Sequence, residues 1–106
     1  MKEIKAVFGP QRLAGVRDAL RRLPGYPGMT VTKAEGSMAP SAHARHTIKE
    51  ELTDSIARVR IEIVAPDDVA DALFDTIVAV VSAGTPGDSV VWISNVERAA
   101  FVHKTV

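Results

Sequence analysis

The stretch Val59-Arg60-Ile61-Glu62-Ile63-Val64 alternates apolar and charged side chains, and Pro66-Asp67-Asp68 follows one residue later. A period of two predicts a β-strand with one buried face. The two acids predict a helix start, because carboxylates are favoured near the positive N-terminal end of the helix dipole. The apolar stripe expected of this helix is Val69, Leu73, Ile77 and Val81. A glycine-rich segment from Ala83 to Asp88 ends it.

The amino-terminal part of the chain predicts a similar strand and helix. Residues Lys2–Phe8 alternate like a strand, and Gly9-Pro10 interrupts the alternation. From Gln11 onward the period changes to that of an amphipathic helix of about three turns. Its apolar positions are Leu13, Val16, Leu20 and Leu23. The segment from Pro24 to Gly28 ends this helix, and Met29–Lys33 predicts a short strand.

The rest of the chain predicts a long loop and further strands. Residues 35–57 show no sustained apolar stripe and are expected to form a loop, mobile over about residues 37–57. Val90–Ile93 predicts a buried strand, and Ala99–Val102 a further one. The whole chain, residues 1–106, is thus expected to be one ferredoxin-like βαββαβ domain of the α+β class. Its antiparallel sheet would carry both helices on one face.

Alternation divides the expected sheet into two faces. The positions that should meet the helices are Ile4, Ala6, Phe8, Val59, Ile61 and Ile63. The opposite face is mixed, with Lys5, Val7, Thr30, Thr32, Arg60, Glu62 and Val64. The apolar members of this mixed face suggest partial cover by another subunit, so the pattern favours an oligomer.

Composition excludes several classes of protein. Thirteen Lys plus Arg balance thirteen Asp plus Glu, so nothing indicates a nucleic acid or an anionic membrane as partner. The absence of Cys excludes a disulfide framework and a thiolate metal site. No apolar run approaches the roughly 20 residues that span a bilayer. The first residues lack the features of a signal peptide, and we expect a cytoplasmic protein without direct membrane insertion.

Several segments resemble the PII nitrogen-regulatory signalling proteins in register along nearly the whole chain. Lys2–Val7 and Arg12–Leu20 are similar to the family's opening, and Gly28–Thr32 to its second strand. Val59–Asp68 resembles its third strand and the start of its second helix. The resemblance implies a bacterial-type homotrimer that binds ATP or ADP, often with 2-oxoglutarate, in clefts between subunits. A long loop would then engage a target protein or membrane transporter, which makes the protein a regulator rather than an enzyme.

The resemblance also implies a nucleotide site. Thr30, Glu62 and Val64 would lie around the base and ribose, and Arg58 would be a cation in the cleft. Gly87 and Asp88 would belong to a loop that offers backbone N–H groups to phosphate. The complete set of expected nucleotide-binding residues is Thr30, Gly36, Arg58, Glu62, Val64, Gly87, Asp88 and Ser89.

Three positions depart from the family pattern. Val90 stands where the family has a lysine, and Phe101 and His103 stand where it has arginines. A hydrogen bond to a charged group contributes roughly 1.5–3 kcal/mol, so the loss of these cations weakens the binding of the nucleotide's phosphates. We therefore expect ADP or AMP, rather than ATP, as the effector. Arg98 and Lys104 are cations that could offset part of the loss.

The long loop carries its own hypotheses. It lacks the tyrosine that some family members carry for uridylylation, because Tyr26 is the chain's only Tyr. His43 and His46 are spaced to meet one Zn²⁺ or Cu²⁺ if the segment is helical, with Glu50 as a third ligand. The alternatives are a solvated polar loop and a trimer that has lost nucleotide binding. The loop residues expected to contact a target are Ser41, His43, Arg45, His46 and Lys49.

An enzyme is not expected. None of the serines lies in a nucleophile elbow, and no phosphate-binding loop with a lysine is present. Asp67 and Asp68 fit a helix start better than an acid–base pair.

Overall fold

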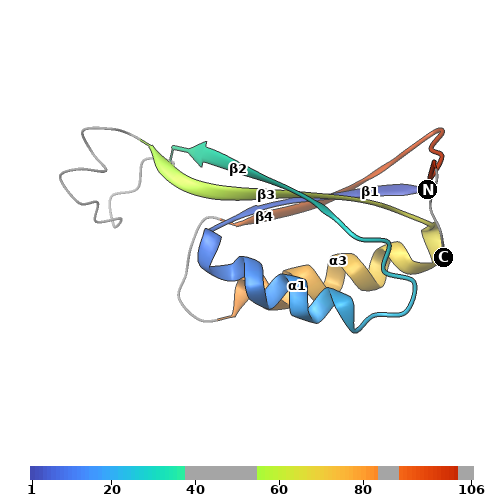
Figure 1. Cartoon of the computed structure of the whole chain (residues 1–106), viewed down its shortest axis with the longest axis horizontal. Helices are drawn as coiled ribbons and strands as arrows, with labels where there is room; N and C mark the ends of the chain where they lie inside the picture. The colour runs from blue at the N-terminus through green and yellow to red at the C-terminus, as the bar shows by residue number, and fades with distance from the viewer. Residues whose placement is uncertain (38–54, 84–88, 103–106) are drawn as a thin grey trace.

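The computed structural model describes residues 1–37, 55–83 and 89–102. Over these ranges the chain forms one sheet and a layer of helices (Figure 1). The elements in chain order are β1 (Lys2–Phe8), the 3-10 turn η1 (Pro10–Arg12), α1 (Leu13–Arg21), β2 (Thr30–Gly36), β3 (Ile56–Ala65), α3 (Asp67–Ser82) and β4 (Val90–Asn95).

The sheet has the strand order β2-β3-β1-β4, and every pair of neighbours is antiparallel. Helices α1 and α3 lie together on one face of it (Figure 1). In each strand–helix–strand unit the two strands are therefore separated in the sheet by one strand of the other unit. This arrangement confirms the predicted ferredoxin-like α+β fold.

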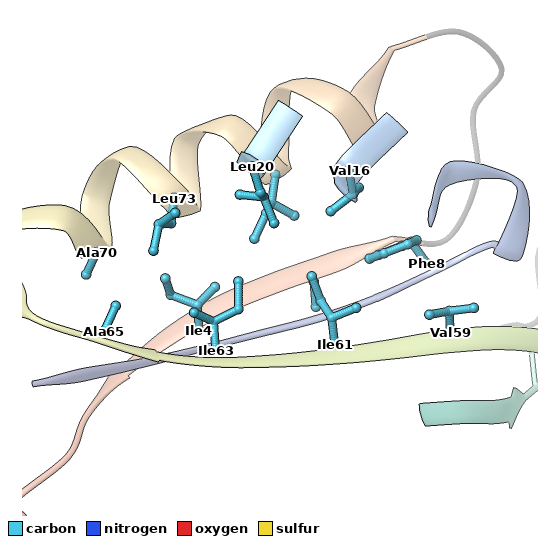
Figure 2. Packing of buried hydrophobic residues seen from close by; sticks show 12 residues of the cluster. Ile4, Phe8, Val16, Leu20, Val59, Ile61, Ile63, Ala65, Ala70 and Leu73 are labelled. Atoms are coloured by element: carbon cyan, nitrogen blue, oxygen red, sulfur yellow. The ribbon is translucent and has the colours of Figure 1, made fainter. Parts of the chain in front are cut away.

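The core lies between the helices and one face of the sheet. From β1 and β3, alternate side chains point toward α1 and α3, as Figure 2 shows for Ile4, Phe8 and Ile61. Helices α1 and α3 contribute Val16, Leu20 and Leu73 to the same core (Figure 2). All of the positions expected to meet the helices are buried, each at most 5% exposed: Ile4, Ala6, Phe8, Val59, Ile61 and Ile63.

Two expectations about strand boundaries are wrong. Residues 35–57 were expected to be loop throughout, but β2 continues to Gly36 and β3 begins at Ile56, with Glu35 paired to Ala57. These ends extend beyond the helix layer (Figure 1), so no buried face imposes an alternation that the sequence could reveal. Backbone pairing alone carries the two strands outward.

Ala99–Val102 was expected to be a strand and is not one. Within the described sheet β4 pairs with β1, which begins at Lys2 opposite Asn95. One further backbone hydrogen bond, from the Val96 N–H to the Met1 carbonyl, continues the pairing at 3.1 Å. After this bond the chain leaves the sheet, and residues 97–102 form no strand.

The turn between α1 and β2 depends on two glycines with positive φ. Gly25 has φ +79°, and a Cβ there would lie 2.8 Å from Cγ1 of Val69 on α3. Gly28 has φ +95° and nothing within 4 Å of such a Cβ. L side chains rarely adopt this conformation, so glycine lets the chain turn from the helix layer into the edge strand β2.

Candidate functional site

The sheet face opposite the helices, called here the outer face, carries polar and charged side chains in rows. Register places Glu62 of β3 between Thr30 of β2 and Lys5 of β1, and Lys5 is followed by Trp92 of β4. In the next row Glu3 lies opposite Val64. The sequence predicted this composition, because residues two apart on a strand share a face.

A hollow of about 460 Å³ opens at one end of the outer face. Its size falls within the range of roughly 300–1,000 Å³ that small-molecule sites occupy. Strands β1, β2 and β3, the α1–β2 turn and the segment after β4 all contribute to it. Its lining residues, which define the outer hollow, are Glu3, Pro27, Gly28, Met29, Thr30, Glu62, Val64 and Phe101.

Both charged residues among those lining the outer hollow are acids. Glu3 forms an ion pair with Lys5, with Lys5 Nζ 3.6 Å from Oε1 of Glu3. Glu62 pairs with Arg60, whose Nε lies 3.3 Å from Oε1 of Glu62. The two cations are not among the lining residues, so the hollow presents carboxylate oxygens, the Thr30 hydroxyl and the Phe101 ring. These groups suit a ligand with hydroxyl or amino groups and a flat apolar part.

Tyr26 lies beside the hollow, in the turn that leads to Pro27. Burial raises the pKa of its phenol, and the positive charges of Arg21 and Arg17 oppose that rise. The Tyr26 side chain is therefore neutral near pH 7, and its contribution is to packing, since it lies against the core.

The expected nucleotide-binding residues form two groups within the described protomer. Thr30, Glu62 and Val64 line the same hollow, although Thr30 is 32 residues from Glu62 in sequence. Gly36 and Arg58 meet elsewhere, and a Cβ on Gly36 would lie 3.3 Å from Cγ of Arg58. Arg58 and Glu62 are four positions apart on β3, about 13 Å at a strand rise of roughly 3.3 Å per residue.

Ser89 lies at the same end of the sheet as Arg58. It immediately precedes Val90, which pairs with Val7, and Val7 in turn pairs with Arg60. Ser89 is exposed, and Val90, which stands where the resemblance places a lysine, is 51% exposed on the outer face. The remaining expected site residues, which are Ser41, His43, Arg45, His46, Lys49, Gly87, Asp88 and His103, lie outside the described residues.

Five lining residues of the outer hollow were not among the expected nucleotide-binding residues: Glu3, Pro27, Gly28, Met29 and Phe101. Glu3 had a usable signal, because it lies two residues from Lys5 and so shares the polar face of the first strand with it. Phe101 had another, because the resemblance places a phosphate-binding arginine at that position, whereas Pro27, Gly28 and Met29 had none. Phe101 reaches the hollow only because the chain leaves the sheet after β4, and the sequence predicted a strand there instead.

Residues 1–37, 55–83 and 89–102 contain no group of three or more His, Asp or Glu side chains placed to hold a metal ion. The loop histidines lie beyond those ranges, so their metal site stays a prediction. Neither described helix has the length and apolar character needed to cross a bilayer.

Comparison with known proteins covers nearly the whole chain. The family model described as nitrogen regulatory protein P-II matches residues 1–105. Nitrogen regulatory protein P-II 1 of Escherichia coli K12 is 37% identical over 99 residues, which cover 92% of this chain and 88% of that protein. The P-II protein of Bradyrhizobium diazoefficiens is 36% identical over 100 residues, 93% of this chain and 88% of its own length. The P-II protein of Klebsiella oxytoca is 36% identical over 99 residues, with coverage of 92% and 88%.

Proposed function

The chain belongs to the nitrogen regulatory protein P-II family, and we propose from this premise that it senses an adenine nucleotide and regulates a target protein in response. The effector is ADP or AMP rather than ATP. The target is an enzyme or a membrane transporter, contacted through the segment of about residues 37–57. The protein acts as a regulator and not as a catalyst.

The observation that carries this proposal is the meeting of Thr30, Glu62 and Val64 in the outer hollow. The family resemblance independently places these three residues around the base and ribose. They come from two strands, and antiparallel pairing aligns Thr30 directly with Glu62. A hydroxyl and a carboxylate side by side suit the hydroxyl groups of a ribose and the amino group of adenine.

The two groups of expected site residues favour a cleft shared by two protomers. One protomer keeps Glu62 about 13 Å along β3 from Arg58, with the row of Thr32 and Arg60 between them. In a homotrimer, the hollow of one protomer would face the Arg58 end of the next. The exposed Trp92 (39%) and Val90 on the outer face provide apolar surface for such an assembly.

Signalling then requires that the nucleotide bind one state of the protein better than another. A ligand with equal affinity for both states shifts neither population. β2 and β3 connect the two regions, because they run from the hollow at Thr30 and Glu62 to the base of the target-binding segment at Gly36 and Ile56.

Deleting residues 41–48 should abolish target capture and leave the oligomer intact. Normal capture by the deleted form would contradict the role of this segment.

Calorimetric titration of the purified protein with AMP, ADP and ATP, with and without Mg²⁺, tests the effector. Micromolar binding of AMP or ADP is the expected result, and Thr30→Val should weaken it at least tenfold. Thr32→Val is the matched control, since Thr32 lies two residues along the same face of β2 but does not line the hollow. Absence of heat at millimolar nucleotide, or equal losses in both variants, would reject the site.

A further inference from the structure

We propose that the outward surface of helices α1 and α3, called here the helix surface, binds the helix surface of a second copy of this chain through opposite charges. The proposal goes beyond the proposed function, because it uses neither the outer hollow nor the segment of residues 37–57. The helix surface lies on the opposite side of the domain from the outer face, so this contact leaves the proposed trimer intact.

Charge is divided between the two helices. The segment from η1 to the C-cap of α1 carries four Arg and one Asp, whereas α3 carries four Asp and neither Lys nor Arg. The chain as a whole has no formal net charge, so this division gives the helix surface a basic half and an acidic half. The charged residues are Arg12, Arg17, Asp18, Arg21 and Arg22 in the first segment, and Asp67, Asp68, Asp71 and Asp75 in α3.

Four of these charges are exposed and form no ion pair with any residue that the structure describes: Arg21, Arg22, Asp71 and Asp75. Asp71 and Asp75 are four residues apart and share one side of α3. They lie beyond its first turn, where the helix dipole no longer favours an acid. Their charges are therefore not explained by the helix end and are available to another molecule.

The two helices run antiparallel, and this brings opposite charges to the same level (Figure 1). A Cβ on Gly15 of α1 would lie 3.3 Å from Cγ1 of Val80 on α3, so the helices are in contact there. Arg21 is six residues after Gly15 and Asp75 is five residues before Val80. At a rise of roughly 1.5 Å per residue, these steps are about 9 and 7.5 Å, and both lead toward the same end of the helix pair. Arg21 and Asp75 are thus level with each other on neighbouring helices.

A two-fold axis parallel to the helices makes this arrangement self-complementary. Rotation about such an axis, placed between two helix surfaces, sets α1 of one copy over α3 of the other and keeps each residue at its level. Arg21 of each copy then meets Asp75 of the other, and the contact forms twice because a two-fold interface uses the same patch on both copies. Ala72 and Ala79 are exposed on the same side of α3 as Asp75 and are small enough to let the second helix approach.

Sedimentation velocity of the full chain at low and high salt tests the proposal. Single exposed ion pairs are weak, so we expect association at millimolar protein and low salt. The screening length is about 30 Å at about 0.01 M salt and about 3 Å at about 1 M. Low salt should therefore give species larger than the high-salt oligomer, with association at least tenfold tighter. Sedimentation that does not change with salt would overturn the proposal.

Charge reversals test the pairing itself. Arg21→Glu places acids on both helices, and Asp75→Lys places bases on both, so each variant alone should associate at least tenfold more weakly than the wild type. An equimolar mixture of the two variants should associate again, because every contact between unlike copies then joins opposite charges. A mixture that does not associate would reject this contact.

Arg98→Glu and Glu97→Lys are the matched controls. They make the same changes in net charge at exposed residues after β4, outside the helix surface. Each control should associate like the wild type, and their mixture should associate no more strongly. Effects equal to those of Arg21→Glu and Asp75→Lys would assign the association to net charge and overturn the proposal. Circular dichroism of each variant checks that the fold is retained.

Discussion

The two faces of the sheet are built from alternate residues of the same strands, yet they differ in almost every property. On β3, Val59, Ile61 and Ile63 are at most 5% exposed beneath the helices. Between them, Arg60 and Glu62 form an ion pair on the outer face. The inner face excludes water and supplies the stability of the domain, whereas the outer face holds the hollow and the expected ligand contacts.

This contrast separates positions that specify the fold from positions that specify function. Burial of apolar area stabilises the domain regardless of ligand, so the inner face tolerates few changes. The outer face is free of that constraint, so its carboxylates, hydroxyls and aromatic rings are available for binding. Substitutions on the two faces should therefore have opposite consequences, large for folding on one and large for binding on the other.

The largest expected effect is on the inner face. Ile61→Ala should lower the free energy of unfolding by about 2–5 kcal/mol, because it removes a fully buried side chain and leaves a cavity. Urea unfolding followed by circular dichroism measures this loss. Thr32→Ala, one strand away on the outer face, should change stability by no more than about 0.5 kcal/mol. If Ile61→Ala does not fold, Ile61→Val should still cost about 0.5–1.5 kcal/mol.

The next largest effect is expected at the two glycines of the α1–β2 turn. Gly25 lies against the helix layer, whereas Gly28 lines the hollow. Gly25→Ala should destabilise more than Gly28→Ala, because both impose an unfavourable positive φ, worth about 1–3 kcal/mol, but only Gly25 also brings a Cβ against Val69. Thermal unfolding of the two variants measures the difference. Equal losses would mean that Val69 moves aside without cost. Gly28→Ala should instead show the larger effect on ligand binding, since Gly28 lines the hollow.

Substitutions at Glu62 and at its partner Arg60 separate the effect of ligand contact from that of ion pairing on the outer face. Glu62→Gln and Arg60→Gln break the same partly exposed ion pair, so each should change stability by at most about 1 kcal/mol. Only Glu62 lines the hollow, and Glu62→Gln alone should weaken AMP at least tenfold. Parallel urea melts and calorimetric titrations give both quantities. A binding loss of the same size in Arg60→Gln would assign the effect to the ion pair rather than to ligand contact.

The smallest expected effect lies at the start of α3, away from both faces. The Met1 amino group lies 2.9 Å from Oδ1 of Asp67, and this hydrogen bond and charge hold the pKa of the Asp67 carboxyl below its ordinary value. A lowered pKa in the folded state stabilises the protein above the unfolded carboxyl's pKa, about 3.9. That contribution disappears as the pH falls through the lowered folded value.

Asp67→Asn tests this linkage through the unfolding midpoint at several pH values. The variant should be slightly less stable than the wild type at pH 6, and the two curves should converge toward pH 2. Asp68→Asn, the adjacent acid in the same first turn, is the control, because no ion pair to the amino terminus is recorded for it among the described residues. A gap between wild type and Asp67→Asn that persists at pH 2 would show that charge is not its cause.

Most of the fold was predictable from the sequence because its signals are local. The alternation in β1 and β3 and the apolar stripe of α3 each follow from burial of one side of a regular element. The failures occurred where burial is absent. The outer ends of β2 and β3 extend beyond the helices, so their pairing has no hydrophobic pattern, and Ala99–Val102 is apolar yet forms no strand.

The sequence by itself determined which residues face the helices, which lie on the polar side, and that the chain carries two strand–helix–strand units. Only the tertiary structure decided that Glu3, Thr30, Glu62 and Phe101 line one hollow. Hydrophobic periodicity acts within a few residues and is visible along the chain. Convergence of four distant segments depends on strand order, on register and on the path after β4. Those follow from the packing of the whole domain, which no single stretch of sequence encodes.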